Sequence, residues 1–234
     1  MGLRSHGIHW RTAAAVWVLV GGLLGPPMAG AAPAATDVDE VVEQVQATCS
    51  RVQDLTARFH QTATSRAAGT VQEASGLFLM KRPGKMRWEY QKPEARLFVT
   101  DGKTLWAFSP ADKQVVVQEV GEAFASRMPL TFLAGDCQLR REFTITAVKH
   151  AGTRASPTTR ILDLKPARDA AGIARLLLEV NVQTYTVERT TLFDAAGNTT
   201  VIALTNLKLN SGLSDHQFQF TPPAGVTVVT PPSR

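Results

Sequence analysis

The chain has 234 residues, of which 44% are hydrophobic, so it can form one large domain and is too apolar to be disordered. Its formal charge of +5 comes from basic residues that are spread along the chain rather than gathered in one patch. Strong nucleic-acid binding normally requires such a patch, so the composition argues against a nucleic-acid partner. The mild charge also gives little reason to expect a protein that adheres to membrane surfaces.

Residues 1–35 are typical of a secretory signal peptide. Two arginines precede the apolar run 13–24, and alanine-rich sequence follows up to Ala35. This order of basic, apolar and small residues is the pattern of an export signal. The apolar run is shorter than the roughly 20 residues that span a bilayer, which disfavours a membrane anchor. We expect cleavage between about residues 31 and 35, and a single exported domain over residues 36–234.

The expected domain begins with an amphipathic helix and continues as a series of strands. After Asp37, which suits a helix N-cap, apolar residues recur at steps of three and four up to Leu55. From Leu55 onward apolar and polar residues alternate, which indicates strands buried on one face. Beyond the first strand, the alternation predicts strands at 71–81, 86–91, 96–100, 104–108, 114–119, 143–149, 160–164, 174–182, 186–193, 199–209 and 217–220.

Turns and short helices separate these strands. Asp101-Gly102 predicts a two-residue type I′ turn, whose two central residues both need a positive φ. Residues 120–135 favour two short helical pieces interrupted at Pro129. Antiparallel strands in this number predict a mainly β fold with a strongly curved sheet or a barrel. Because a barrel of that size encloses more volume than one layer of side chains fills, we expect a cavity that helices partly cover.

Motifs for catalysis are missing from the sequence. It contains no nucleophile elbow, phosphate-binding loop, dinucleotide-binding glycine pattern or zinc-protease motif. Beyond the signal peptide, His60, His150 and His216 are far apart and have no patterned acidic or cysteine neighbours. We therefore predict a protein that is not an enzyme, with no catalytic residues, metal or cofactor. The alternative from a different class is an envelope hydrolase that acts on acyl groups through a site assembled only in space.

Cys49 and Cys137 are 88 positions apart, a separation that does not match a metal-binding motif. An exported protein meets an oxidising compartment, where a disulfide can form. A disulfide also needs the two α carbons to lie close together, and a sequence does not give that distance. A disulfide and two buried free thiols therefore both remain open.

Large apolar side chains recur on the strand faces of the first half of the domain. Phe78 and Met80 share a face with Arg82, so all three are expected to point inward. A buried guanidinium needs hydrogen-bond acceptors, and the carbonyl groups at a helix C-terminus are one source of them. Because of this inward arginine, the apolar residues are candidates for a cavity lining rather than an ordinary core. The candidates are Phe78, Met80, Met86, Trp88, Tyr90, Trp106 and Phe108.

The segment from Val71 to Phe108 resembles the LolA family of periplasmic outer-membrane lipoprotein carrier proteins. Four pieces carry the resemblance in order: Val71-Gln72-Glu73, Lys81-Arg82-Pro83, Trp88 with Gln91-Lys92-Pro93, and Asp101-Gly102-Lys103-Thr104-Leu105-Trp106. Near the end of the chain, residues 218–226 are similar to the family's Phe-x-Phe-x-Pro-Pro-x-Gly-Val sequence. The similarity runs in order through the whole expected domain and is densest from Phe59 to Phe108.

The resemblance implies an unclosed, half β-barrel of about eleven antiparallel strands, with a lid of about three α-helices over a hydrophobic cavity. Arg82 matches the family's arginine that hydrogen-bonds the lid when the cavity is empty, which makes it a lid latch. Leu130, Phe132 and Leu133 align with the lid helices and join the predicted cavity lining. Met86 stands where the family usually has an aromatic residue near the barrel mouth.

The resemblance also implies a function. It is that of a monomeric chaperone in the periplasm that binds the acyl chains of lipoproteins and carries them to the outer membrane. The implied partners are acylated lipoproteins, the inner-membrane lipoprotein-releasing ABC transporter and an outer-membrane lipoprotein acceptor. Within the same fold, the alternative is a binding protein that senses lipids or envelope stress.

Overall fold

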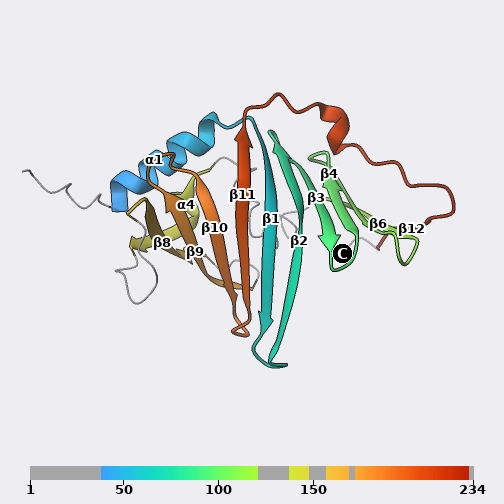
Figure 1. Ribbon diagram of the computed structural model, residues 1–234, viewed down its shortest axis with the longest axis horizontal. Coiled ribbons are helices and arrows are strands. Elements are labelled where there is room, and N and C mark those ends of the chain that lie inside the picture. The colour runs from blue at the N-terminus through green and yellow to red at the C-terminus, as the bar shows by residue number, and fades with distance from the viewer. Residues whose placement is uncertain (1–37, 121–136, 148–156, 169–171, 232–234) are drawn as a thin grey trace, which may run out of the picture. The chain divides into compact units, whose positions relative to one another are not determined.

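A computed structural model describes residues 38–120, 137–147, 157–168 and 172–231 of the chain. These residues form one unclosed sheet of twelve strands in the order β12-β6-β5-β4-β3-β2-β1-β11-β10-β9-β8-β7 (Figure 1). The strands are β1 Asp54–Ser65, β2 Thr70–Lys81, β3 Lys85–Lys92, β4 Arg96–Thr100, β5 Thr104–Ser109, β6 Gln114–Glu119, β7 Phe143–Ala147, β8 Thr159–Pro166, β9 Ile173–Asn181, β10 Val187–Asp194, β11 Thr199–Leu209 and β12 Thr227–Val229.

The described helices are α1 (Val38–Arg51), the one-turn α4 (Leu139–Glu142) and the 3-10 helix η1 (Asp215–Phe218). Helix α1 forms where the valine spacing predicted it, and its apolar stripe is buried. That stripe packs against leucines of β8 and β9, and Leu139 of α4 joins the same cluster. Residues 1–35 and the expected helical pieces at 121–135 lie outside the described residues.

The mainly β, unclosed fold is confirmed, with two differences in detail. The expected strand at 217–220 is wrong, because Asp215–Phe218 forms η1, with the Ser214 hydroxyl accepting the N–H of His216 at its start. A strand that the alternation did not predict, β12, pairs in parallel with β6. The sheet has twelve strands, where the resemblance implied about eleven, and one of its pairs is parallel.

The predicted type I′ turn at Asp101-Gly102 is also wrong. Gly102 has a positive φ of 97°, but Asp101 does not. The Asp101 carboxylate instead accepts the backbone N–H groups of Lys103 and Thr104, both at 2.8 Å. An aspartate that bonds its own backbone two or three residues ahead shapes a turn without needing a positive φ itself. The turn is therefore centred one residue later than the sequence indicated.

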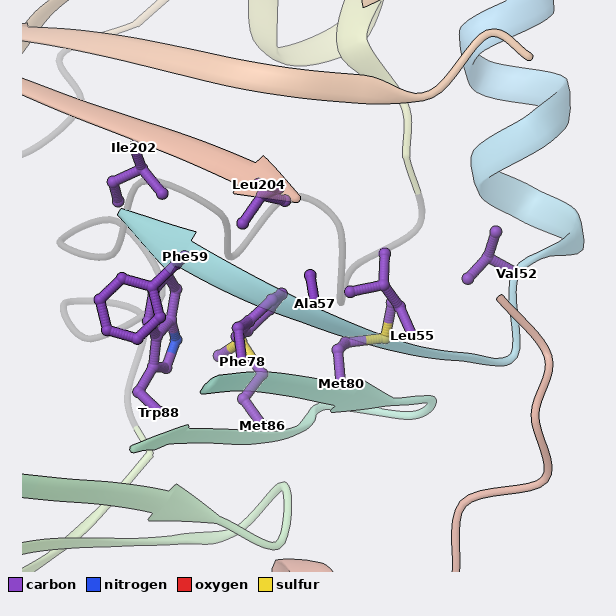
Figure 2. Packing of buried hydrophobic residues seen from close by; sticks show 10 residues of the cluster. All are labelled: Val52, Leu55, Ala57, Phe59, Phe78, Met80, Met86, Trp88, Ile202 and Leu204. Atoms are coloured by element: carbon purple, nitrogen blue, oxygen red, sulfur yellow. The ribbon is translucent and has the colours of Figure 1, made fainter. Parts of the chain in front are cut away.

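One face of the sheet, which we call the inner face, carries the core of β1, β2 and β3. Paired residues share a face, so each step of the register forms a row across the three strands. The first row is Leu55, Met80 and Met86, the second is Ala57, Phe78 and Trp88, and the third is Phe59, Gly76 and Tyr90. Figure 2 shows the first two rows and Phe59 packed together with Val52, Ile202 and Leu204. Helix α1 covers the same face over β8 to β10.

Gly76 allows β2 and β3 to approach closely at a register shift between Ser75 and Gly76. A Cβ atom at Gly76 would lie 1.8 Å from the backbone oxygen of Glu89 and 3.0 Å from the Phe59 ring. No side-chain rotation removes the contact with Glu89, because the obstacle is backbone. Phe59 covers the glycine and fills the space that a side chain would otherwise take.

We expect Gly76→Ala to lower the free energy of unfolding by about 3 kcal/mol or more, since overpacking against backbone must separate two paired strands. Urea denaturation followed by circular dichroism measures this loss. The neighbouring Ser75→Ala is the control, and its effect should stay within about 0.5 to 1 kcal/mol. Similar losses for the two variants would show that the close approach at Gly76 is not needed.

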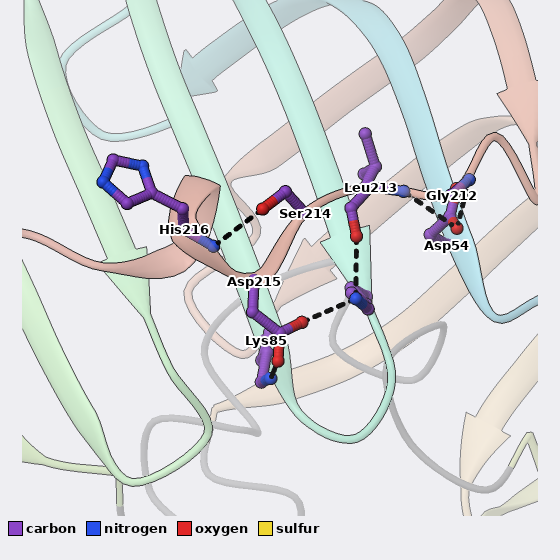
Figure 3. A network of polar contacts seen from close by, with 8 residues as sticks. Asp54, Lys85, Gly212, Leu213, Ser214, Asp215 and His216 are labelled. Atoms are coloured by element: carbon purple, nitrogen blue, oxygen red, sulfur yellow. Dashed lines mark hydrogen bonds and ion pairs between the residues drawn. The ribbon is translucent and has the colours of Figure 1, made fainter.

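The segment after β11 crosses the outer face of the sheet and is held by the Asp54 carboxylate (Figure 3). One oxygen accepts the backbone N–H of Ser211 at 2.7 Å, and the other accepts that of Gly212 at 2.9 Å. Burial raises the pKa of Asp54, but hydrogen bonds from Ser211, Gly212 and Leu213 lower it more, so the net pKa lies below the usual value. The side chain is 4% exposed, so this carboxylate is a buried anchor.

A second contact fixes η1 on the same face. The Asp215 carboxylate accepts from Lys81 at 2.6 Å and from Lys85 at 2.7 Å. These two bonds hold the pKa of Asp215 down to about 2. Lys81 also donates to the backbone oxygen of Leu213 at 2.7 Å, so one lysine holds two points of the segment.

We expect Asp54→Asn to destabilise the protein at pH 7 by about 1–3 kcal/mol, because it weakens a set of charge-assisted bonds. The folded pKa of Asp54 is lowered, so its contribution is complete above the unfolded value of about 3.9 and is lost as the pH falls further. The variant should therefore lose less stability than the wild type between pH 5 and pH 3. Urea unfolding at several pH values measures this, with the exposed Asp112→Asn as the control. If the two variants behaved alike, the anchoring role of Asp54 would be refuted.

Candidate functional site

The inner face brings together most of the residues that the sequence singled out for a cavity. Phe78, Met80, Met86 and Trp88 are each 5% exposed or less. The Trp88 ring lies 4.4 Å from that of Phe78, measured between centroids. Tyr90 is half-buried one row further along, and its hydroxyl donates to the Gln61 side chain at 3.0 Å. Burial raises the pKa of Tyr90, so it remains a neutral donor.

Two of the predicted lining residues, Trp106 and Phe108, point to the outer face. In the β3–β4–β5 register, Trp88 pairs with Phe98, and Phe98 pairs with Ala107. Trp106 pairs with Val99 and therefore lies on the opposite face. Alternation within one strand does not say which of its faces continues a face of the next strand. The pairing across the short β4–β5 hairpin is the signal that could have assigned Trp106 and Phe108 to the face opposite Trp88.

The outer face has a small apolar cluster of its own where the C-terminal segment covers it. The Phe108 ring lies 5.4 Å from that of Phe220. Val99, Val115 and Phe218 are fully buried. Trp106 and Phe108 thus belong to the strands beneath this C-terminal covering rather than to an inner cavity. Leu130, Phe132 and Leu133 lie outside the described residues.

Arg82 follows β2 and reaches the C-terminal end of α1. Its Nε donates to the backbone oxygen of Val52 at 2.9 Å, and Nη2 donates to that of Cys49 at 3.3 Å. The last carbonyl groups of a helix lack partners within the helix and carry the negative end of its dipole, so a cation is favoured there. The acceptors that the sequence suggested for an inward arginine are therefore present.

A disulfide between Cys49 and Cys137 lies beside the same guanidinium. The two α carbons are 6.0 Å apart, within the range that a disulfide requires. Nη2 of Arg82 also contacts both sulfur atoms, at 3.4 Å for Cys49 and 2.6 Å for Cys137. Arg82 is thus bound to a helix end that is itself covalently tied to the segment leading into α4.

Further contacts join α1 to α4. Arg140 of α4 forms an ion pair with Asp39 of α1. The Arg140 backbone N–H donates to the Gln46 side chain at 3.2 Å. With the disulfide, these contacts link the two helices at both ends of α1. The helices must therefore move together if they move at all.

A small apolar pocket that opens to solvent lies between the end of α1 and the sheet, with about 30 Å³ of space for water-sized molecules. Leu55 and Met80 form part of its wall on the sheet, and Cys49 and Val52 form part of its roof. The full lining is Val45, Thr48, Cys49, Val52, Leu55, Met80, Tyr185, Thr186, Val187, Leu207 and Leu209. This mostly apolar lining suits hydrocarbon.

The described residues contain neither a metal-binding cluster nor a membrane-spanning helix. No group of three or more histidine, cysteine, aspartate or glutamate side chains is placed to hold a metal ion in that part of the chain. None of the helices seen there has both the length and the apolar character needed to cross a membrane.

Comparison with known proteins assigns the family. Residues 50–221 match the model of the outer membrane lipoprotein carrier protein LolA. The chain belongs to the LolA family. Outer-membrane lipoprotein carrier proteins of Dechloromonas aromatica and Chromobacterium violaceum are each 34% identical to it. The alignments cover 80% and 94% of this chain, and 86% and 95% of the relatives.

A solved structure supports the fold of this LolA-family chain. An uncharacterized conserved protein from Thermus thermophilus aligns with a TM-score of 0.53 at 16% sequence identity. The alignment covers 82% of this chain and 98% of that protein. At such low identity the likeness concerns the fold alone.

Removal of the disulfide should cost stability because it closes a long loop. We expect the double variant Cys49→Ala/Cys137→Ala to lose roughly 2–5 kcal/mol of unfolding free energy. Reduction of the wild type with dithiothreitol should give a similar loss, measured by urea denaturation. The double variant is the control for the reductant and should not respond to it. An unchanged midpoint in the reduced wild type would mean that the bond does not stabilise the fold.

Proposed function

We propose that this protein binds the acyl chains of lipoproteins on its inner face and carries them through the periplasm to the outer membrane. The observation that carries the proposal is the apolar pocket beneath α1, in a chain that belongs to the LolA family. In this proposal the protein is a binding chaperone without enzymatic activity. Residues 1–35 are its signal peptide, and residues 36–234 are the exported carrier domain.

The partners in this proposal are acylated lipoproteins, an inner-membrane lipoprotein-releasing ABC transporter that loads the carrier, and an outer-membrane acceptor that unloads it. The relatives' names support the cargo, since both are called outer-membrane lipoprotein carrier proteins. The transporter and the acceptor follow from the transport itself, because a carrier that runs between two membranes needs a donor and a recipient.

Binding must be strong enough to load and weak enough to unload. Each methylene removed from water contributes roughly 0.8 kcal/mol, so one long acyl chain contributes about 10 kcal/mol. A site that gained all of this energy would not release its cargo. Contacts that exist only in the empty protein offset part of the gain, because the ligand must break them to enter.

Arg82 is the proposed source of that offset. Its hydrogen bonds to Val52 and Cys49 hold the end of α1 over the pocket. A cargo chain that enters beneath α1 must displace the helix and break these bonds. The disulfide and the Asp39–Arg140 pair make α1 and α4 move together, so Arg82 restrains both helices at once.

Isolation of the loaded protein tests the cargo directly. The tagged, full-length protein is expressed in its Gram-negative host, purified from the periplasm without detergent, and analysed by mass spectrometry. The expected result is co-purification of peptides with an acylated N-terminal cysteine. Recovery of the protein with phospholipid or free fatty acid but without acylated peptides would refute the lipoprotein cargo.

We expect Arg82→Leu to bind a synthetic triacylated lipopeptide about tenfold more tightly than the wild type and to release it more slowly. The variant lacks two or more charge-assisted bonds that stabilise only the empty state. Fluorescence displacement measures affinity, and transfer to acceptor vesicles measures release. Arg87→Leu is the matched control, because Arg87 lies on the outer face and pairs with Glu89. Release from Arg82→Leu at the wild-type rate would eliminate the latch.

A further inference from the structure

Two buried polar groups on the inner face have no hydrogen-bond partner. Among the described residues, the buried side-chain nitrogen and oxygen atoms in this condition are Nε1 of Trp88 and Oγ1 of Thr190. Trp88 is 2% exposed and Thr190 is 0% exposed. Because buried polar groups are almost always hydrogen-bonded, a buried donor without a partner marks a position where a ligand acceptor would fit chemically.

The strand register places Trp88 and Thr190 on the same side of the sheet. Trp88 pairs with Phe78 on β2, and Thr190 pairs with Ile202 on β11 and with Leu178 on β9. Phe78, Ile202 and Leu178 are all buried in the inner-face core. The two groups therefore face the surface that the proposed function assigns to lipid, one from each half of the sheet.

The polarity of the inner face changes in one direction along the strands. The row nearest Arg82 is apolar, with Leu55, Met80 and Met86. The next row contains the Trp88 indole N–H. The row after it contains Tyr90, whose hydroxyl already has a partner in Gln61. A long-chain acyl group has the same order of polarity, with an apolar tail, then one carbonyl, then a polar head.

The Trp88 ring is fixed in place, so its N–H has a defined direction. The Phe59 ring meets it edge-on at 4.9 Å, and the Phe78 ring lies against it at 4.4 Å. Figure 2 shows the indole beside Phe59, with its nitrogen turned toward the side where Phe78 lies. An indole nitrogen can only donate, so the partner that it lacks is an acceptor such as a carbonyl oxygen.

We propose that the Trp88 N–H donates a hydrogen bond to the carbonyl oxygen of a bound acyl group, so that the site selects acyl esters and amides over bare hydrocarbon. This inference rests on the proposed function and orients its ligand. The tail lies toward the pocket under α1, and the head lies toward Tyr90. The Thr190 hydroxyl is placed to donate to a second acyl carbonyl from the other half of the sheet.

The test compares a lipopeptide that carries two palmitoyl esters with its analogue that carries two hexadecyl ethers. The two probes share their tails and peptide and differ in the carbonyl groups. One hydrogen bond to a carbonyl should make the ester-to-ether affinity ratio about tenfold higher in the wild type than in a variant that lacks the donor. We expect Trp88→Phe to reduce the ester-to-ether affinity ratio by about that factor. Thr190→Val should reduce the same ratio, and the double variant should reduce it further.

Phe78→Leu is the matched control, because it removes an aromatic ring from the same row without removing a donor. Its affinities for both probes should fall together, and their ratio should stay at the wild-type value. A measurement on the unmodified protein does not depend on how the variants fold. With the indole nitrogens labelled with 15N, the ester should shift the Trp88 N–H proton resonance downfield, and the ether should not.

The outcomes separate this inference from the proposed function. If both probes bind, the ester-to-ether affinity ratio is the same in the wild type and in Trp88→Phe, and the Trp88 resonance does not shift, then the carbonyl bond is refuted. The carrier function is unaffected by that result. If dipalmitoyl phosphatidylglycerol binds as tightly as the ester lipopeptide with the same Trp88 dependence, the carbonyl bond is supported and lipoprotein specificity fails. If none of the three probes binds, both proposals fail.

Discussion

The contact between Arg82 and the C-terminal end of α1 is the constraint on which the rest of the site depends. A single guanidinium joins the β2–β3 connection to the last carbonyl groups of a helix and to a disulfide. Cations are stabilised at this end of a helix because the carbonyl dipoles point outward there. Polar bonds that a hydrocarbon cannot replace therefore hold the C-terminal end of α1 beside the pocket, while apolar packing against β8 and β9 holds the rest of the helix.

The two faces of the sheet are stabilised mainly by different interactions. The inner face consists of apolar side chains that pack with one another in the empty protein and can also pack with acyl chains. The outer face holds the C-terminal segment through the buried Asp54 carboxylate and the ion pairs of Asp215. Such directional bonds fix one arrangement, whereas apolar contacts tolerate many.

The sequence predicted those parts of the fold that follow from local periodicity. The valine spacing of α1 and the alternation of the strands each report burial on one face, and both were confirmed. Periodicity could not assign Trp106 and Phe108 to a face, because that depends on pairing between strands. It also predicted a strand at 217–220, where Asp215–Phe218 instead forms a 3-10 helix. The partners of Asp54 lie more than 150 positions away in the chain, beyond any local pattern.

In the site too, features that depend on neighbouring residues could be predicted from the sequence, and features that depend on distant residues could not. The inward direction of Arg82 could be predicted from the alternation of its own strand. Carbonyl groups at a helix C-terminus were one of the acceptors expected for it. The missing partners of Trp88 and Thr190 could not be predicted, since an unsatisfied atom is recognised only when all its neighbours are known. Unpaired donors lower the stability of the empty protein, and the bonds of Arg82 raise it. The difference between these two contributions helps to set the binding free energy of a ligand. A carrier must keep this difference small, because it has to bind and release the same chain.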